Sequence, residues 1–157
     1  MGRNVAVAVA LVVVVTFFYK DMIINGFAPD RAWASFQGYI EAAGNNDLET
    51  LRKFSSNLSA TCEDPLQRTE CNSLMTGVYK LTKEFKRADF KHAEFNERGG
   101  MLYTDYTQDE NSIRFIISFK KSGFWNYQVA GIRYCFGSEL DKEEISERCL
   151  DEARASF

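Results

Sequence analysis

Only one side chain in the sequence titrates near neutral pH, so acid–base chemistry would have to involve it. His92 is the sole histidine, and a carboxylate beside it, from Asp89 or Asp105, would polarise the imidazole and let the pair transfer protons. The competing interpretation is a solvent-facing strand histidine between Lys91 and Glu94, and we favour it. If a ligand pocket exists, we expect His92 to line it.

Tyrosine and aspartate side chains offer a second acid–base pair. Tyr103 and Asp105 share one face of an expected strand, whereas Tyr106 points to the other face. Ordinary strand aromatics and an acid near a turn explain the same residues, and no nucleophile, metal or phosphate motif accompanies them. We therefore assign no catalytic residue, no metal and no cofactor, and we lean against enzymatic activity.

Aromatic residues of the last expected strand could line a pocket for a small apolar ligand, with core packing as the alternative. These residues are Trp125, Tyr127, Tyr134 and Phe136. A basic cluster could contact an acidic partner protein or anionic lipid, with a solvated helix face as the alternative. It comprises Lys80, Lys83, Lys86, Arg87 and Lys91. Within it we expect Lys83, Lys86 and Arg87 to bind a partner protein, whereas the net charge of −3 argues against nucleic acid.

The four cysteines favour disulfide bonds over a metal site. Cys62, Cys71, Cys135 and Cys149 all follow an N-terminal apolar segment, and an even number of cysteines in an exported domain is typical of disulfides. Three pairings are possible. Cys62 and Cys71 bracket a turn at 63–65, while Cys135 ends a strand and Cys149 lies in the next helix, so we favour 62–71 and 135–149. Free thiols are an alternative; zinc is disfavoured because no C-x-x-C spacing exists.

The N-terminal segment predicts where the chain acts. Residues 5–19 are apolar without interruption, with Arg3 before them and Lys20 after them. As a helix this run is shorter than the hydrocarbon core of a bilayer, but the bulky residues that follow argue against signal cleavage. We expect an uncleaved signal-anchor, a transmembrane helix over about 4–27; a cleaved signal peptide and a buried core helix are the alternatives.

Charge at the two ends of the apolar run predicts its orientation. Arg3 and the amino terminus favour a cytoplasmic N-terminus. We therefore expect residues 1–28 to form the membrane anchor and residues 29–157 to form one extracytoplasmic domain, periplasmic or in an equivalent compartment. A domain of this length can bury a hydrophobic core.

Helical periodicity dominates the first half of the domain. A helix opens at Pro29 and Asp30 and ends near Gly44, and a second helix follows at about 46–54. A third helix is expected from about 71 to 87. Its buried stripe is expected to contain Leu74, Val78, Leu81 and Phe85.

The second half alternates as strands do. Strands are expected at about 90–96, 101–107, 113–119 and 124–136, before a final helix at about 141–155. In the third strand Ile113, Phe115, Ile117 and Phe119 should face the helices. The last strand is apolar on both faces, with Tyr127 and Val129 on one and Ile132 and Tyr134 on the other, which predicts a central strand or a cavity wall. Gly131 predicts a bend in it.

Two stretches carry a resemblance to a known family. The helix–turn–helix of residues 39–51 and the hairpin turn at 121–125, which reads Lys-Ser-Gly-Phe-Trp, resemble the opening helices and closing hairpin of nuclear transport factor 2-like domains, the SnoaL/ketosteroid-isomerase-like superfamily. Three helices followed by about four antiparallel strands already predict an α+β fold, and the resemblance implies that the helices pack on a curved sheet. Here an N-terminal transmembrane helix and a C-terminal helix would be added.

The leading functional expectation is a single-pass, membrane-anchored extracytoplasmic interaction module, a non-catalytic subunit or scaffold of a membrane-associated assembly. It would contact the lipid bilayer through residues 4–27 and bind a partner protein. The alternatives are a binder of a small apolar ligand in a conical pocket, and an isomerase- or hydratase-like enzyme that uses His92 or Asp105.

Overall fold

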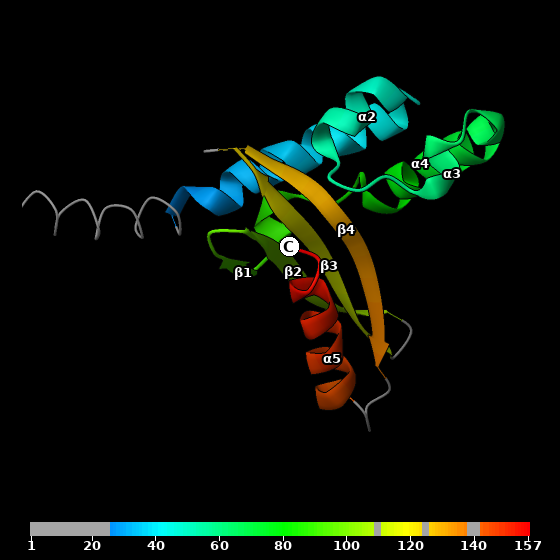
Figure 1. The fold of residues 1–157 in the computed structure, drawn as a ribbon. Coiled ribbons are helices and arrows are strands. Elements are labelled where there is room, and N and C mark those ends of the chain that lie inside the picture. The colour runs from blue at the N-terminus through cyan, green and yellow to red at the C-terminus, as the bar shows by residue number, and fades with distance from the viewer. Residues whose placement is uncertain (1–25, 109–110, 124–125, 138–141) are drawn as a thin grey trace, which may run out of the picture.

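The computed structural model describes residues 26–108, 111–123, 126–137 and 142–157. Helices come first, a four-stranded antiparallel sheet follows, and a helix ends the chain (Figure 1). The predicted α+β class and the predicted sheet of four antiparallel strands are therefore confirmed. The helices before the sheet comprise residues 26–44, α2 (Leu48–Phe54), α3 (Ala60–Glu63), the 3-10 helix η1 (Pro65–Gln67), α4 (Arg68–Thr82) and the 3-10 helix η2 (Arg87–Asp89).

Local capping explains where several of these helices begin and end. The side chain of Asp47 accepts a hydrogen bond from the backbone N–H of Thr50 at 3.0 Å and caps α2. The third helix was expected to continue to residue 87, but α4 ends at Thr82. The Thr82 hydroxyl donates to the backbone oxygen of Val78 at 2.6 Å, a bond of the kind that slightly destabilises and bends a helix.

The sheet is a simple meander in the order β1-β2-β3-β4. Its strands are β1 (His92–Phe95), β2 (Gly99–Gln108), β3 (Asn111–Ser122) and β4 (Asn126–Gly137). Each strand pairs with the next in antiparallel register, so residues far apart in sequence, such as Tyr103 and Ile116, lie directly opposite each other.

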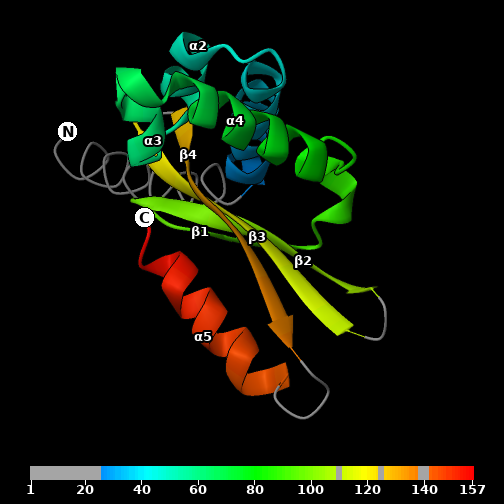
Figure 2. The same ribbon diagram turned by 90° about the vertical axis from the view of Figure 1, so that its right-hand side faces the viewer.

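The sheet is covered on both faces. Figure 2 shows α4 on one side of the sheet and α5 (Lys142–Arg154) on the other. The first face carries Phe115, Ile117 and Phe119, all fully buried in one core cluster with Trp33 and Phe36 of the first helix. The predicted orientation of these strand residues is therefore confirmed.

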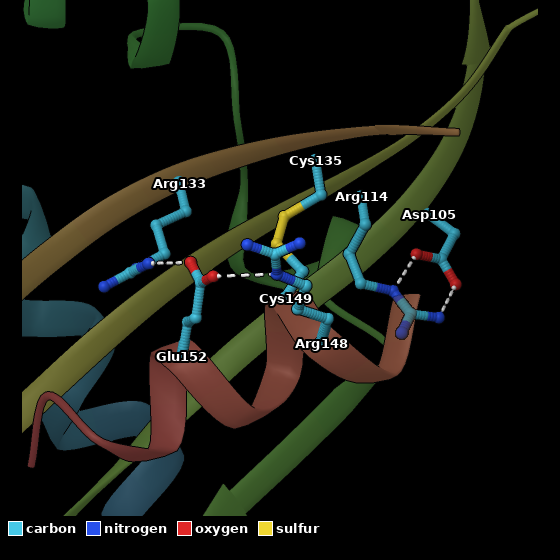
Figure 3. Close-up of a disulfide and its surroundings, with 7 residues drawn as sticks. All are labelled: Asp105, Arg114, Arg133, Cys135, Arg148, Cys149 and Glu152. Atoms are coloured by element: carbon cyan, nitrogen blue, oxygen red, sulfur yellow. Dashed lines mark hydrogen bonds and ion pairs between the residues drawn. A yellow bond between two sulfur atoms is a disulfide. The ribbon is translucent and has the colours of Figure 1, made fainter. Parts of the chain in front are cut away.

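The α5-facing side of β3 is also buried, although alternation with polar residues predicted only one buried face. Ile116 and Ser118 are fully buried, and Ile116 packs in a cluster with Leu150 and Ala153 of α5. The disulfide between Cys135 and Cys149 and the bond from Arg133 to Glu152 at 2.8 Å join β4 to α5 (Figure 3).

Gly131 marks an irregularity in β4, as expected. Ser118 pairs with Gly131 and Phe119 with Val129, so Ala130 is an extra residue on β4. A bulge of this kind resets the two-residue alternation of side chains. Residues on the two sides of the bulge, which simple alternation assigned to opposite faces, therefore share the helix-facing side and pack against one core cluster.

The position of β4 in the sheet corrects the sequence interpretation. It is the last strand in the order and therefore an edge strand, not a central one. Simple alternation assigns the apolar residues of β4 to two faces, but the bulge changes the alternation of its side chains. Tyr127 and Val129 are buried in the same cluster against which Ile132 and Tyr134 pack.

The predicted fold class is wrong in its transmembrane helix. Among the residues that the structure describes, no helix is both long enough and apolar enough to cross a membrane. Most of the predicted anchor at 4–27 lies outside the described residues. Residues 26–27 belong to the helix at 26–44, whose apolar side, including Ala28 and Phe36, is buried in the core.

Both favoured disulfides are confirmed. Cys62 is bonded to Cys71 with a Cα–Cα distance of 4.8 Å, and Cys135 is bonded to Cys149 with a Cα–Cα distance of 6.4 Å. The first bond ties α3 to α4, and both of its cysteines are buried. The second bond ties the sheet to the C-terminal helix.

Candidate interaction surface

The three predicted ligand-binding residues that the structure describes, Tyr127, Tyr134 and His92, are spread across the sheet. Tyr127 is buried and its ring meets Phe95 edge-on at 5.5 Å, so it serves the core. Tyr134 lies further along β4, beyond the bulge, and His92 lies on β1 at the opposite edge of the sheet. Trp125 lies outside the described residues.

The predicted acid–base residues do lie together, on the α5-facing side of the sheet. The His92 ring stacks on Tyr103 at 4.7 Å, and Arg114 lies over the Tyr103 ring at 5.1 Å. Arg114 also donates two hydrogen bonds to Asp105, at 2.6 and 2.8 Å (Figure 3). Tyr106, as expected, is on the other face, next to Phe85 at 6.3 Å.

The carboxylates that were considered as partners of His92 are engaged elsewhere. The hydrogen bonds from Arg114 hold the pKa of Asp105 below its usual value, which makes Asp105 a weaker base. Asp89 accepts the backbone N–H of Lys86 at 2.7 Å. This arrangement is that of a structural ion pair beneath an exposed histidine.

The basic cluster divides into a structural arginine and exposed lysines. Arg87 donates to Asp30 at 3.1 Å and to the backbone oxygen of Phe90 at 3.0 Å, so it ties the segment after α4 to the first helix. Lys83 and Lys86 are exposed. The Lys83 ammonium lies 3.6 Å from the carboxylate of Glu84. Of the three predicted partner-binding residues, only the two lysines present their side chains outward.

The apolar stripe predicted for α4 is partly exposed. Leu74 and Leu81 are 48% and 62% exposed, while the helix buries Cys71, Met75 and Thr82 instead. The bond from Cys71 to buried Cys62 accounts for this rotation, because it holds the cysteine side of α4 against α3. The spacing of the leucines in the sequence contains no information about how this disulfide orients α4.

Leu81 lies next to an exposed aromatic end of β4. The Tyr134 ring packs on Phe115 at 4.6 Å, and its hydroxyl donates to the backbone oxygen of Leu81 at 3.4 Å. Phe136 follows two residues later on the same face and is 63% exposed. We call Leu81, Tyr134 and Phe136, with the exposed Lys83 and Lys86 that follow α4 in the chain, the α4–β4 surface.

The α4–β4 surface combines predicted and unpredicted residues. Tyr134 and Phe136 were candidates for a pocket, and Lys83 and Lys86 were candidates for partner binding. Leu81 was assigned to the core, so its role was missed. The lysines at 80, 83 and 86, which interleave with the end of the leucine stripe, are the sequence signal that this part of the stripe reaches solvent.

In a Tyr134→Phe variant, the free energy of unfolding should fall less steeply with rising alkaline pH than it does in the wild type. Burial raises the pKa of Tyr134 to about 12, whereas an unfolded tyrosine titrates near pH 10. The folded state therefore disfavours the phenolate, and this contribution is present below about pH 10 and is lost as pH rises towards about 12. Chemical unfolding at pH 9, 10 and 11 should show a shallower decline for Tyr134→Phe than for the wild type; equal slopes would contradict the assignment.

Clefts occur elsewhere on the described part of the chain. One of about 540 Å³ lies between the β1–β2 turn and the C-terminus, where Arg154 donates two hydrogen bonds of 3.1 Å to Glu94. Another of about 460 Å³ lies along α4 and is lined mainly by small polar residues between Thr69 and Lys80. Neither cleft includes a predicted ligand-binding residue, and only the second includes a member of the basic cluster, Lys80. Within the described residues, no group of three or more acidic, histidine or cysteine side chains could hold a metal ion.

Comparison with known proteins identifies no relative: no family model, no curated protein and no solved structure matches the chain. The resemblance to nuclear transport factor 2-like domains therefore stays a prediction. A fold alone does not determine function, which depends on the residues of a particular site.

Proposed function

We propose that the protein is an extracytoplasmic interaction module that binds a partner protein through the α4–β4 surface and catalyses no reaction. One observation carries the proposal: Leu81 and Phe136 are each more than 60% exposed, and Tyr134, two residues before Phe136, donates its hydroxyl to the backbone oxygen of Leu81. Large apolar side chains that gather on a surface are typical of a binding site, whereas single exposed ones are ordinary.

A protein fits this surface better than a small ligand does. Pockets for small apolar ligands enclose most of the ligand and are lined mainly by apolar side chains. Here Leu81 and Phe136 project outward, and the cleft beside the C-terminus is rich in charged residues, including Glu94, Arg98 and Arg154. The exposed Lys83 and Lys86 add a polar margin of the kind found around protein interfaces.

The extracytoplasmic location rests on the cysteines and the N-terminal sequence. Disulfides persist in oxidising compartments outside the cytoplasm, and both pairs are formed. The apolar run at residues 5–19, preceded by Arg3, is the kind of sequence that directs a chain into the export pathway. The two features support the same compartment independently.

Photo-crosslinking should locate the interface. A photoreactive amino acid placed at Phe136, in cells that produce the protein, should give one discrete adduct with a partner protein. Leu66 on η1 is the matched control, because it is an apolar residue 92% exposed and lies outside the α4–β4 surface. Equal crosslinking at both positions would count against a specific interface.

Reversing the charge of the two exposed lysines should then lower the yield of the crosslinked adduct. Lys83→Glu with Lys86→Glu should reduce the yield at Phe136 several-fold without unfolding the domain, because exposed charges contribute little to stability. Arg87 is excluded from this variant because its bonds to Asp30 and Phe90 are structural. His92→Gln should leave the yield unchanged, and a loss in that variant would revive a role for the histidine cluster.

A further inference from the structure

The chemistry of the β4 edge indicates what kind of segment binds beside the α4–β4 surface. We propose that the outer edge of β4, from Gly131 to Gly137, accepts an extended segment of the partner as a fifth strand of the sheet. This inference rests on the proposed function and makes it more specific, because it names the conformation and the side-chain pattern of the bound segment.

The first part of the β4 edge is already closed by the chain itself. Ser55 forms a parallel bridge with Val129, and the backbone N–H of Ser56 donates to the Val129 oxygen at 2.9 Å. The side chain of Gln128 donates to the backbone oxygen of Lys53 at 3.0 Å. The segment after α2 therefore occupies this edge up to the bulge.

Beyond the bulge the edge is open. Among the described residues, no other strand or loop forms backbone hydrogen bonds with the outer side of Gly131–Gly137. Alternate residues of an antiparallel edge strand direct their N–H and C=O groups outward. At about 3.3 Å per residue the open stretch spans roughly 20 Å, which is the length of an ordinary strand.

Beyond the bulge at Ala130, two of the usual protections of an edge strand, shortness and proline, are missing from this stretch. Natural edges are shortened, charged or interrupted by proline, and β1 at the other edge is short, covering only His92–Phe95. The stretch Gly131–Gly137 contains no proline and one charged residue. That residue, Arg133, faces α5 and is bonded to Glu152 at 2.8 Å, so it serves the fold rather than guarding the edge.

The two sides of the open edge differ in chemistry, which defines the pattern of the bound strand. On the helix-facing side an added strand would meet Tyr134, Phe136 and Leu81, which favour apolar side chains. On the α5-facing side it would meet Arg133 and Arg148, two cations that share the single carboxylate of Glu152 at 2.8 and 3.4 Å, so that one positive charge is left over. Alternating apolar and acidic residues therefore match the edge, and acidic residues at one end would also suit the exposed lysines after α4.

Selection from a library of random twelve-residue peptides, displayed on phage and screened against the full chain in detergent micelles, tests the proposal. Peptides whose binding is lost in Phe136→Asp and kept in the matched control Leu66→Asp should show apolar residues at every second position. On synthetic copies, N-methylation of alternate residues should weaken binding about tenfold or more per amide, because each removes one edge hydrogen bond. N-methylation of the residues between them should have little effect.

Hydrogen exchange of the complex gives a second readout. Bound peptide should slow exchange of alternate amides within Gly131–Gly137 and leave Val129, whose edge is already paired, unchanged. Peptides with helical spacing that tolerate N-methylation would overturn strand addition and leave the proposed surface standing. If the selection gives no peptide whose binding is lost in Phe136→Asp, both the strand addition and the proposed surface would be overturned. A dimer of the full chain that protects the same amides would also overturn the proposal, by making a second copy the occupant.

Discussion

Replacing Phe115 with alanine should lower the free energy of unfolding by about 3–5 kcal/mol, the usual loss when a fully buried phenylalanine leaves a cavity. The Phe115 side chain is fully buried at the centre of the helix-facing core. Its ring stacks on Phe85 at 4.5 Å and contacts Tyr134 at 4.6 Å and Phe90 at 5.7 Å. Equilibrium unfolding of the full chain in mild detergent, monitored by circular dichroism, measures the change.

Phe136→Ala is the matched control for this prediction. The residue type is the same and the side chain points to the same face of the sheet, but Phe136 is largely exposed, so its removal should change stability by less than about 0.5 kcal/mol. Similar losses at Phe115 and Phe136 would mean that the core is misplaced. Arg114 is unsuitable as a control, because it is tied to Asp105 by two hydrogen bonds.

Removing the disulfide between Cys62 and Cys71 should lower the free energy of unfolding by about 3 kcal/mol, because the unfolded chain gains conformational entropy. The variant Cys62→Ala with Cys71→Ala leaves no buried unpaired thiol at the site. Its loss should appear in chemical unfolding under oxidising conditions. The wild type in a strong reductant should lose at least as much, because both of its disulfides would open.

The bond between Cys135 and Cys149 should contribute a similar amount but act on another part of the molecule. Removing it should speed hydrogen exchange in α5, which it ties to β4, and leave α4 unchanged. In a Cys149→Ala variant, Cys135 should become the one residue open to alkylation. Alkylation of Cys62 or Cys71 in that variant would show that the pairing differs in solution.

Local patterns predicted the helix-facing side of β3 but not the burial of its α5-facing side. The strict alternation of Ile113, Phe115, Ile117 and Phe119 placed them on the helix-facing side because adjacent residues of a strand point to opposite faces. The short separations within each cysteine pair similarly predicted the disulfides, since neighbouring elements of a chain usually pack together. Both inferences needed only distances along the sequence.

The candidate surface was predicted only in part. Tyr134 and Phe136 were recognised as binding candidates, but the partner expected for them, Trp125, lies outside the described residues, and Tyr127 is in the core. Leu81 was assigned to the core because its spacing matched an apolar stripe. The rotation of α4 that exposes it depends on the bond from Cys71 to Cys62, a contact between two elements.

The sequence by itself determined the α+β class and the helix-facing side of β3, and it favoured the cysteine pairing that the structure has. These properties depend on periodicity and on short separations, which the order of residues contains directly. Only the tertiary structure decided that β4 is an edge strand, that a bulge at Ala130 gathers its aromatic residues on one face, and that part of the α4 stripe meets solvent. The physical reason is that exposure depends on which elements pack together. Among the described residues, α5 covers one face of the sheet, the segment after α2 closes only the first part of the β4 edge, and no other element pairs with the remainder.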